Sequence, residues 1–155
     1  MIGLGNPLVS DDSVGLRVAA SLKDRLAYRD DVDVAEDYWG GLRLMERMIG
    51  YQRAIVIDAM CTGAAPGTIH LAMARDFATH RSASAHDVDL PTALTFGRAA
   101  GAALPRDEDV MLVGVEAADL IRFAEQCTPE VTGAIPLAVT RVVHLLDAMQ
   151  GEQSR

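Results

Sequence analysis

Residues 54–58, Ala54-Ile55-Val56-Ile57-Asp58, join a continuous apolar run directly to a carboxylate. A run without alternating polar residues is typical of a strand that is buried on both faces of a parallel sheet. The segment Val110-Met111-Leu112-Val113-Gly114-Val115 has the same character. We therefore expect two central strands, and we expect any functional site to form where such strands end and loops lead into helices.

The segments around these two runs alternate between strand and helix patterns. Residues 1–4, 32–36 and 68–73 predict further strands, and residues 42–50, 91–103 and 117–125 predict short helices. Apolar side chains recur at helical spacing along 14–26 and again along 135–149, after a Thr128-Pro129 start. The alternation predicts a single α/β domain at 1–150, a three-layer phosphorylase/hydrolase-like fold whose mostly parallel central sheet has helices on both faces. Residues 151–155 are expected to form a frayed C-terminal tail.

Composition limits the partners of the chain. It has 155 residues, half of them hydrophobic, and 22 acidic residues against 14 basic ones give a net charge of −8. Such a field repels phosphate backbones and anionic lipid, which argues against a nucleic-acid partner. Two cysteines do not form a disulfide scaffold, and no apolar run approaches the ~20 residues of a membrane span. Without a signal-peptide pattern at the start, these features predict a cytoplasmic protein that does not insert into a membrane.

Three polar side chains occupy the loops where the chemistry of an α/β sheet is expected. Asp12 follows the first strand and its glycine turn, Asp58 ends the buried run, and His86 lies in the long polar loop at 76–89. Two carboxylates and one imidazole would make an open metal site with two oxygen ligands and one nitrogen ligand. Nickel, zinc, iron and manganese each accept such ligands, so the residues alone predict a metal site without choosing the metal.

Each of these residues also has a purely structural interpretation. Asp12 could complement the dipole of the following helix, and Asp58 could cap the following turn. His86 could be an ordinary loop histidine, and His80 shares its loop. Asp11 is the better candidate for capping the first helix.

A second candidate segment is Trp39-Gly40-Gly41. The indole could line a cleft or cap the core. Flexible glycines beside an aromatic residue suit a segment that receives a peptide, and we therefore expect Trp39, Gly40 and Gly41 to bind substrate.

The stretch Gly3-Leu4-Gly5-Asn6-Pro7-Leu8-Val9-Ser10-Asp11-Asp12-Ser13-Val14-Gly15 resembles the hydrogenase maturation endopeptidases. That family opens with a Gly-x-Gly-Asn turn, an acidic pair and a glycine one turn into the helix. Further along, 55–59 resembles the family's second acidic motif and 84–86 its histidine motif. Residues 112–115 and 128–131 resemble its closing strand and helix, so the resemblance covers nearly the whole chain.

The resemblance implies an endopeptidase that removes the C-terminal extension of a nickel–iron hydrogenase large-subunit precursor after nickel insertion. It implies that Asp12, Asp58 and His86 contact the metal, that the precursor supplies the nickel, and that the isolated protein holds none tightly. The chain departs from the family pattern at Ser13, where many members have glycine, and at Glu116, where proline is common. These departures bear on which hydrogenase is served.

The sequence contains neither His-Glu-x-x-His nor Gly-x-Ser-x-Gly, so hydrolysis would have to use water. We expect Asp12 and Asp58 to position or deprotonate that water, while the metal polarises the scissile carbonyl. A carboxylate near another negative charge has a raised pKa, which helps a base that works near neutral pH. The expected activity is that of a nickel-gated, aspartic-type endopeptidase.

Two other functions remain open at this point. One is a non-enzymatic nickel-binding chaperone or sensor. The other is a peptidyl-tRNA hydrolase-like enzyme, whose family also opens with Gly-Leu-Gly-Asn-Pro. The Thr-Arg-His-Asn run that such an enzyme needs does not follow Pro7.

Overall fold

The two apolar runs form neighbouring parallel strands at the centre of the sheet. β3 (Ala54–Met60) and β5 (Val110–Glu116) pair along their whole length, from Ala54 opposite Val110 to Met60 opposite Glu116. Nearly every side chain on both strands is shielded from solvent. The continuous apolar pattern therefore predicted these strands correctly.

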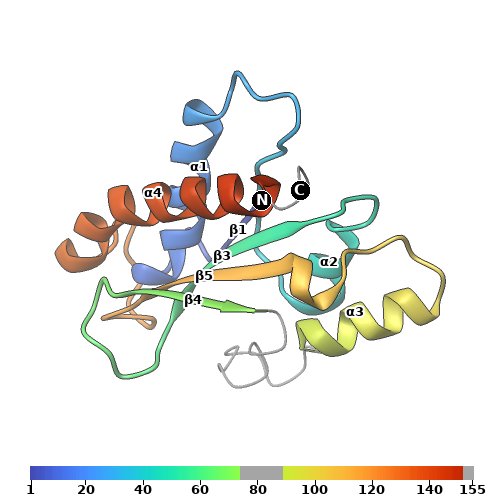
Figure 1. Cartoon of the computed structure of the whole chain (residues 1–155). Helices are drawn as coiled ribbons and strands as arrows, with labels where there is room; N and C mark the ends of the chain where they lie inside the picture. The colour runs from blue at the N-terminus through green and yellow to red at the C-terminus, as the bar shows by residue number, and fades with distance from the viewer. Residues whose placement is uncertain (74–88, 152–155) are drawn as a thin grey trace.

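The computed structural model describes residues 1–73 and 89–151 (Figure 1). Within them the sheet has five strands in the order β2-β1-β3-β5-β4, and β4 alone runs antiparallel to its neighbour. The remaining elements are β1 (Ile2–Leu4), η1 (Asp11–Ser13), α1 (Val14–Arg25), β2 (Ala35–Asp37), α2 (Gly41–Glu46), β4 (Ile69–Met73), α3 (Leu90–Ala99), η3 (Asp107–Asp109) and α4 (Pro129–Gly151).

Helices cover both faces of the sheet, as predicted, and the strands divide their side chains between two cores (Figure 1). Ile55 and Ile57 pack with α1 and α4, whereas Val56 packs with α2 and α3. The strand period of two produces this division, because successive side chains point to opposite faces. Asp58 and Val56 therefore belong to the same face, toward α2 and α3.

Among the described residues, α4 is the one helix long and apolar enough to cross a membrane, by length and composition only. Many of its apolar side chains pack inside the protein. Val131, Ala138 and Val142 are fully buried in the core that α4 shares with α1 and the sheet. Core packing thus explains the buried apolar side chains of α4, whereas Leu137 is 51% exposed.

Two local predictions were wrong. Residues 117–125 form no helix, because the backbone of this segment pairs with other groups. Phe123 bridges to Val9, and the N–H groups of Ala118 and Asp119 donate to the Asp11 carboxylate. β2 begins at Ala35 rather than at residue 32, because a strand needs a partner and its ladder with β1 starts there.

Glycines allow the start of α1 to approach the sheet unusually closely. A Cβ on Gly15 would collide with the carbonyl oxygens of Leu4, the last residue of β1, and Ile57, in the middle of β3. A Cβ on Gly3 would collide with the Gly15 carbonyl and the Ala19 side chain. This contact holds η1, which carries Asp12, against the end of β3.

We expect Gly15→Ala to destabilise the protein by about 1–3 kcal/mol, because the new methyl group must push α1 away from two strands. Denaturant unfolding of the purified variant measures the change. Gly133→Ala is the matched control, since a Cβ there meets no atom and alanine is the better helix former, so its stability should rise by up to about 1 kcal/mol. A Gly15→Ala protein as stable as the wild type would contradict this packing.

Candidate active site

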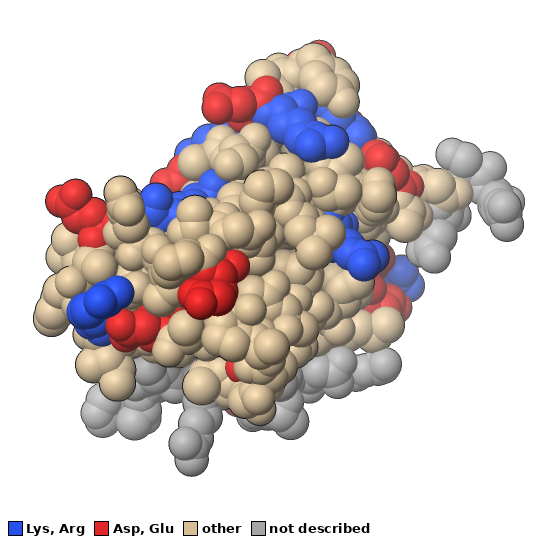
Figure 2. Space-filling view, turned by 90° about the vertical axis from the view of Figure 1, so that its left-hand side faces the viewer, with Lys and Arg blue, Asp and Glu red and all other residues tan. Residues whose placement is uncertain are grey.

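The carboxyl ends of the parallel strands bring several acids to one edge of the sheet. This edge is at the left of Figure 1, and Figure 2 looks onto it. Asp58 lies near the end of β3, and Asp37 and Glu116 are the last residues of β2 and β5. Asp11 and Asp12 follow β1. The hydrogen bonds of these five acids divide them into two kinds.

Asp11 is fully buried, and its carboxylate is used to hold a loop. It accepts hydrogen bonds from the backbone N–H groups of Ala118 (2.8 Å), Asp119 (2.9 Å) and Thr128 (2.7 Å), and from the Thr128 hydroxyl. The expectation that Asp11 caps the first helix was therefore wrong. Its carboxylate instead ties the β1–α1 connection to the loop between β5 and α4.

Glu116 is also buried and fully partnered. It accepts hydrogen bonds from the N–H and hydroxyl of Thr62, the N–H of Gly63 and Nε2 of His70, at 2.7–3.0 Å. Burial alone would raise the pKa of Glu116, but these hydrogen bonds outweigh it and lower the pKa. Glu116 thus fixes the loop that follows β3.

Asp37 has a similar structural role at the end of β2. Its carboxylate accepts from the Tyr38 N–H and from Nε of Arg47, both at 2.8 Å. Burial works to raise the pKa of Asp37, and the Arg47 guanidinium and the backbone donors reverse that effect and lower it. The roles of Asp37 and Glu116 were not predicted from the sequence. Each acid is the last residue of its strand, but the partners Arg47 and Thr62 lie in other segments, so no local pattern indicated these roles.

Asp12 and Asp58 are of the second kind. Asp12 accepts one hydrogen bond, from the Asn6 N–H to Oδ2 at 3.0 Å, and Asp58 accepts one, from the Ala59 N–H to Oδ1 at 2.8 Å. Within the described part of the chain neither forms a salt bridge, and one oxygen of each has no partner. Both side chains are partly exposed.

The protonation of these two carboxyls is linked. Burial raises the pKa of Asp12, and the Asn6 N–H opposes this in part. Burial and then the negative charge of Asp12 raise the pKa of Asp58 to about 7, against the Ala59 N–H. A pKa near 7 lets Asp58 both take and return a proton at neutral pH, which is what a general base requires. The structure therefore brings together the two acids that the sequence singled out.

The third predicted metal-contacting residue, His86, lies outside the described residues, as does His80. Within 1–73 and 89–151, no group of three or more His, Cys, Asp or Glu side chains is arranged to hold a metal ion. The described part of the site is the carboxylate pair. Oxygen ligands of this kind, with an imidazole, suit nickel among other divalent metals.

Trp39 and Gly40 lie between β2 and α2, and Gly41 is the first residue of α2. Trp39 is 55% exposed and lies under the Arg43 guanidinium, 5.7 Å from the ring centroid, so it does not cap the core. Gly41 is buried with φ of +58°, a backbone conformation that favours glycine, whereas nothing lies near a Cβ on Gly40. Substrate binding by this segment stays a prediction.

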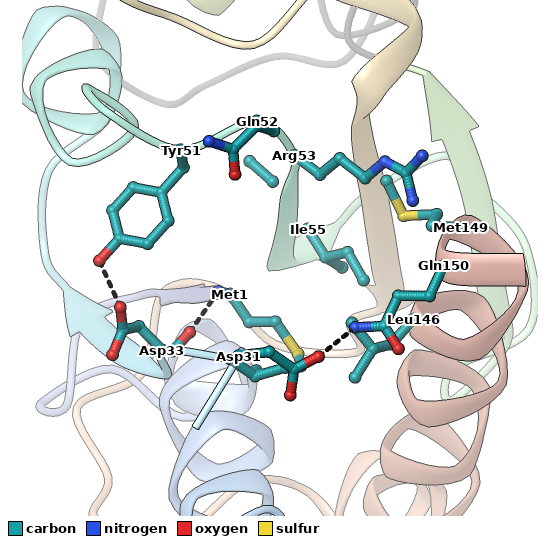
Figure 3. A pocket seen from close by; sticks show the side chains of 12 residues that line it. Met1, Asp31, Asp33, Tyr51, Gln52, Arg53, Ile55, Leu146, Met149 and Gln150 are labelled. Carbon is teal, nitrogen blue, oxygen red and sulfur yellow. Dashed lines mark hydrogen bonds between the residues drawn. The ribbon is translucent and has the colours of Figure 1, made fainter. Parts of the chain in front are cut away.

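A pocket of about 260 Å³ lies at the opposite edge of the sheet, where β1 and β3 begin (Figure 3). Its acids are already engaged. Asp33 accepts from the Tyr51 hydroxyl at 2.6 Å, and Asp31 accepts from the Gln150 amide and from Arg29. This pocket offers no free carboxylate pair, and we place the candidate active site at Asp12 and Asp58.

Comparison with known proteins identifies the family of the chain. The family model for HycI, hydrogenase maturation protease, matches residues 16–145. The chain belongs to the hydrogenase maturation protease family. The hydrogenase expression/formation protein HupD of Rhizobium leguminosarum bv. viciae is 27% identical over 149 residues, 94% of this chain and 72% of HupD. HupM of Azotobacter chroococcum mcd 1 is 31% identical over 128 residues, 79% of this chain and 59% of HupM.

Solved structures of hydrogenase maturation proteases share the fold. The hydrogenase maturating endopeptidase HybD of Escherichia coli superposes with a TM-score of 0.73 at 25% identity, over 95% of this chain and 90% of HybD. The [NiFe] hydrogenase maturation protease HycI of Thermococcus kodakarensis KOD1 gives a TM-score of 0.67 at 20% identity, over 96% and 88% of the two chains. The predicted fold class and family are confirmed.

We expect Asp58→Asn to stabilise the folded protein at neutral pH. Between about pH 4 and pH 7 the unfolded carboxyl ionises while the folded one keeps its proton, so wild-type stability falls as pH rises through this window. The asparagine amide of the variant does not titrate. The advantage of the variant should be small near pH 4, grow to on the order of 2 kcal/mol by pH 7 and then level off, as thermal unfolding across this range would measure.

Glu116→Gln is the control of opposite sign. The pKa of Glu116 is lowered, so the wild-type carboxylate stabilises the fold above its unfolded pKa, and that contribution disappears in acid. The variant should lose about 1.5–3 kcal/mol at pH 7 and less as the pH falls. If the stability of both variants relative to wild type changed with pH in the same direction, the division between engaged and free acids would be contradicted.

The linkage between the two carboxyls gives a separate expectation. Because the Asp12 charge contributes to the raised pKa of Asp58, Asp12→Asn should lower the titration midpoint of Asp58. The midpoint should remain above 3.8, since burial is the larger cause. Carboxyl ¹³C chemical shifts followed against pH would measure it, and an unchanged midpoint would mean that the carboxyls do not face one another.

Proposed function

We propose that this chain is the endopeptidase that removes the C-terminal extension of a nickel–iron hydrogenase large-subunit precursor, once nickel has been inserted. Membership of the hydrogenase maturation protease family supports the protease activity and its place in hydrogenase maturation. The free carboxylate pair is the observation that supports assigning this activity to Asp12 and Asp58. Of the five acids at this edge, Asp12 and Asp58 alone keep an unengaged oxygen within the described residues.

In the proposed mechanism Asp58 is the general base. Its ionised carboxylate takes a proton from water as the water oxygen attacks the scissile carbonyl carbon. Protonated Asp58 then gives that proton to the leaving amine as the C–N bond breaks. A pKa of about 7 suits both steps at neutral pH. The negative charge of Asp12 keeps the proton affinity of Asp58 high, and its free oxygen can orient the water.

The nickel carried by the precursor offers a physical basis for gating. A divalent cation brought beside Asp12 and Asp58 would favour their ionised forms and counter the mutual repulsion that raises the pKa of Asp58. A loaded precursor would therefore meet an ionised base, and an empty precursor a partly protonated one. His86, which resembles the family's histidine motif, is the proposed third nickel contact.

The segment from Trp39 to Gly41 is proposed to receive the peptide. It follows β2 at the same edge of the sheet as the carboxylate pair. An exposed indole supplies apolar contact area, and the positive φ of Gly41 sets the sharp turn into α2.

The test is incubation of purified protein with nickel-loaded and nickel-free cognate precursor, followed by mass spectrometry. We expect loss of a C-terminal peptide from the loaded precursor only. Asp58→Asn and Asp12→Asn should each reduce the rate by about 10²-fold or more, as expected for loss of a general base and its partner. The wild-type kcat/KM should rise with pH up to about 7, as Asp58 of the free enzyme ionises.

Asp24→Asn is the control, because Asp24 is an exposed acid on α1 away from the site, and its rate should match the wild type. Full processing activity in Asp58→Asn would exclude Asp58 as the base. An unchanged mass of correctly loaded precursor, together with tight nickel binding by the isolated protein, would instead identify a nickel chaperone or sensor.

A further inference from the structure

The loop between β5 and α4 is irregular in shape but held at many points. Asp11 accepts three of its backbone N–H groups, and Asp119 accepts the N–H groups of Ile121 (3.0 Å) and Arg122 (2.9 Å). The loop also pairs with the β1–α1 connection. The Ser10 N–H donates to the Arg122 carbonyl at 3.0 Å. The Ala124 N–H donates to the Leu8 carbonyl at 3.1 Å.

This fixed backbone presents apolar side chains to solvent. Ile121 is 87% exposed and Phe123 is 80% exposed, while Leu120 and Leu8 on the paired segments are also exposed. We call these four residues the apolar rim. Figure 2 shows a broad surface without charge across the middle of this side of the molecule, with acidic and basic side chains spread around it. Exposed apolar side chains gathered on one surface are typical of a protein-binding site.

The apolar rim is continuous with the candidate active site. The Leu8 N–H donates to the Asn6 side-chain oxygen at 3.0 Å, and the Asn6 N–H donates to Asp12 at 3.0 Å. Asp11, which holds the loop, is the neighbour of Asp12. A protein whose C-terminal peptide enters between Asp12 and Asp58 must therefore place its folded body against the surface next to these residues.

We propose that the apolar rim is the docking surface for the folded body of the hydrogenase large-subunit precursor, where it contacts an apolar face beside the C-terminal extension. The inference rests on the proposed function and adds a binding surface to it. A rim that is already ordered loses little conformational entropy on binding, and a few well-packed anchor residues supply most of the affinity in protein interfaces. The rim contacts the partner and not the reacting atoms, so it acts on substrate affinity.

The experiment compares wild type with the double variant Ile121→Ser/Phe123→Ser in processing of nickel-loaded cognate precursor. We expect KM to rise about tenfold or more, with kcat at saturating precursor within about twofold of wild type. Both side chains are exposed, so thermal unfolding should be unchanged and should show that the variant folds. Leu8→Ser provides a second variant on the other segment, with an expected rise in KM of several fold.

Tyr28→Ser is the matched control. Tyr28 is 80% exposed, like Phe123, but it follows the C-terminal end of α1 at the opposite edge of the sheet. Its KM should equal that of wild type. An unchanged KM in both rim variants would overturn the proposal. So would a chain that is dimeric in solution, becomes monomeric in the double variant and retains its processing kinetics, because the rim would then be a self-association surface.

A binding measurement separates this inference from the proposed function. The dissociation constant of the complex between Asp58→Asn protein and nickel-loaded precursor is measured with and without the two serine substitutions, and should rise about tenfold or more. If wild type leaves the precursor uncleaved, the proposed activity fails, and the loss of binding still tests the rim. If cleavage occurs and the rim variants bind and cleave as wild type does, the docking proposal alone fails.

Discussion

The close contact of the start of α1 with the end of β1 and the middle of β3 determines the arrangement of the site. A side chain at Gly15 would collide with the carbonyl oxygens of Leu4 and Ile57, and one at Gly5 would collide with the Asp12 carbonyl. With glycine at these positions, the short η1 turn lies directly against the sheet edge. Asp12 and Asp58, 46 positions apart in the sequence, thereby come close enough for one charge to raise the pKa of the other.

The acids at this edge perform opposite tasks, and the difference lies in their hydrogen bonds. Asp11, Asp37 and Glu116 accept several donors each, which compensates for their burial and fixes three loops. Asp12 and Asp58 accept one backbone N–H each and remain poorly compensated. Loss of stability from a partly desolvated charge is expected at sites where a carboxyl must exchange protons, since full compensation would lower its pKa.

The sequence was sufficient to predict the central strands, the α1 and α4 helices and the positions of Asp12 and Asp58, because these depend on local patterns. A buried run such as 54–57 specifies a strand, and the residue after it lies at the carboxyl edge of a parallel sheet. The structure of 117–125 depends on Asp11, which lies more than a hundred residues away, and no local pattern reveals that contact. The start of β2 likewise depends on its pairing with β1.

The role of Glu116 was hidden for the same reason. Its donors come from the loop after β3 and from His70 on β4, so the last residue of β5 serves as an anchor for that loop. That anchor matters because the same loop follows directly from the strand that carries Asp58. Glu116 thus restrains the chain two residues beyond the end of β3, and the hydrogen bonds that Asp11 accepts restrain the chain directly before Asp12.

The location of Asp58 on β3 follows from the same balance of stability and function. β3 pairs with β5 over its full length and with β1 on its other side, and both cores pack against it. A poorly compensated carboxyl lowers the free energy of unfolding wherever it is placed, but on an edge strand it would also promote local opening. On the central strand the backbone hydrogen bonds to the neighbouring strands hold Asp58 in place. Its carboxyl therefore does not move toward solvent, and its pKa stays raised.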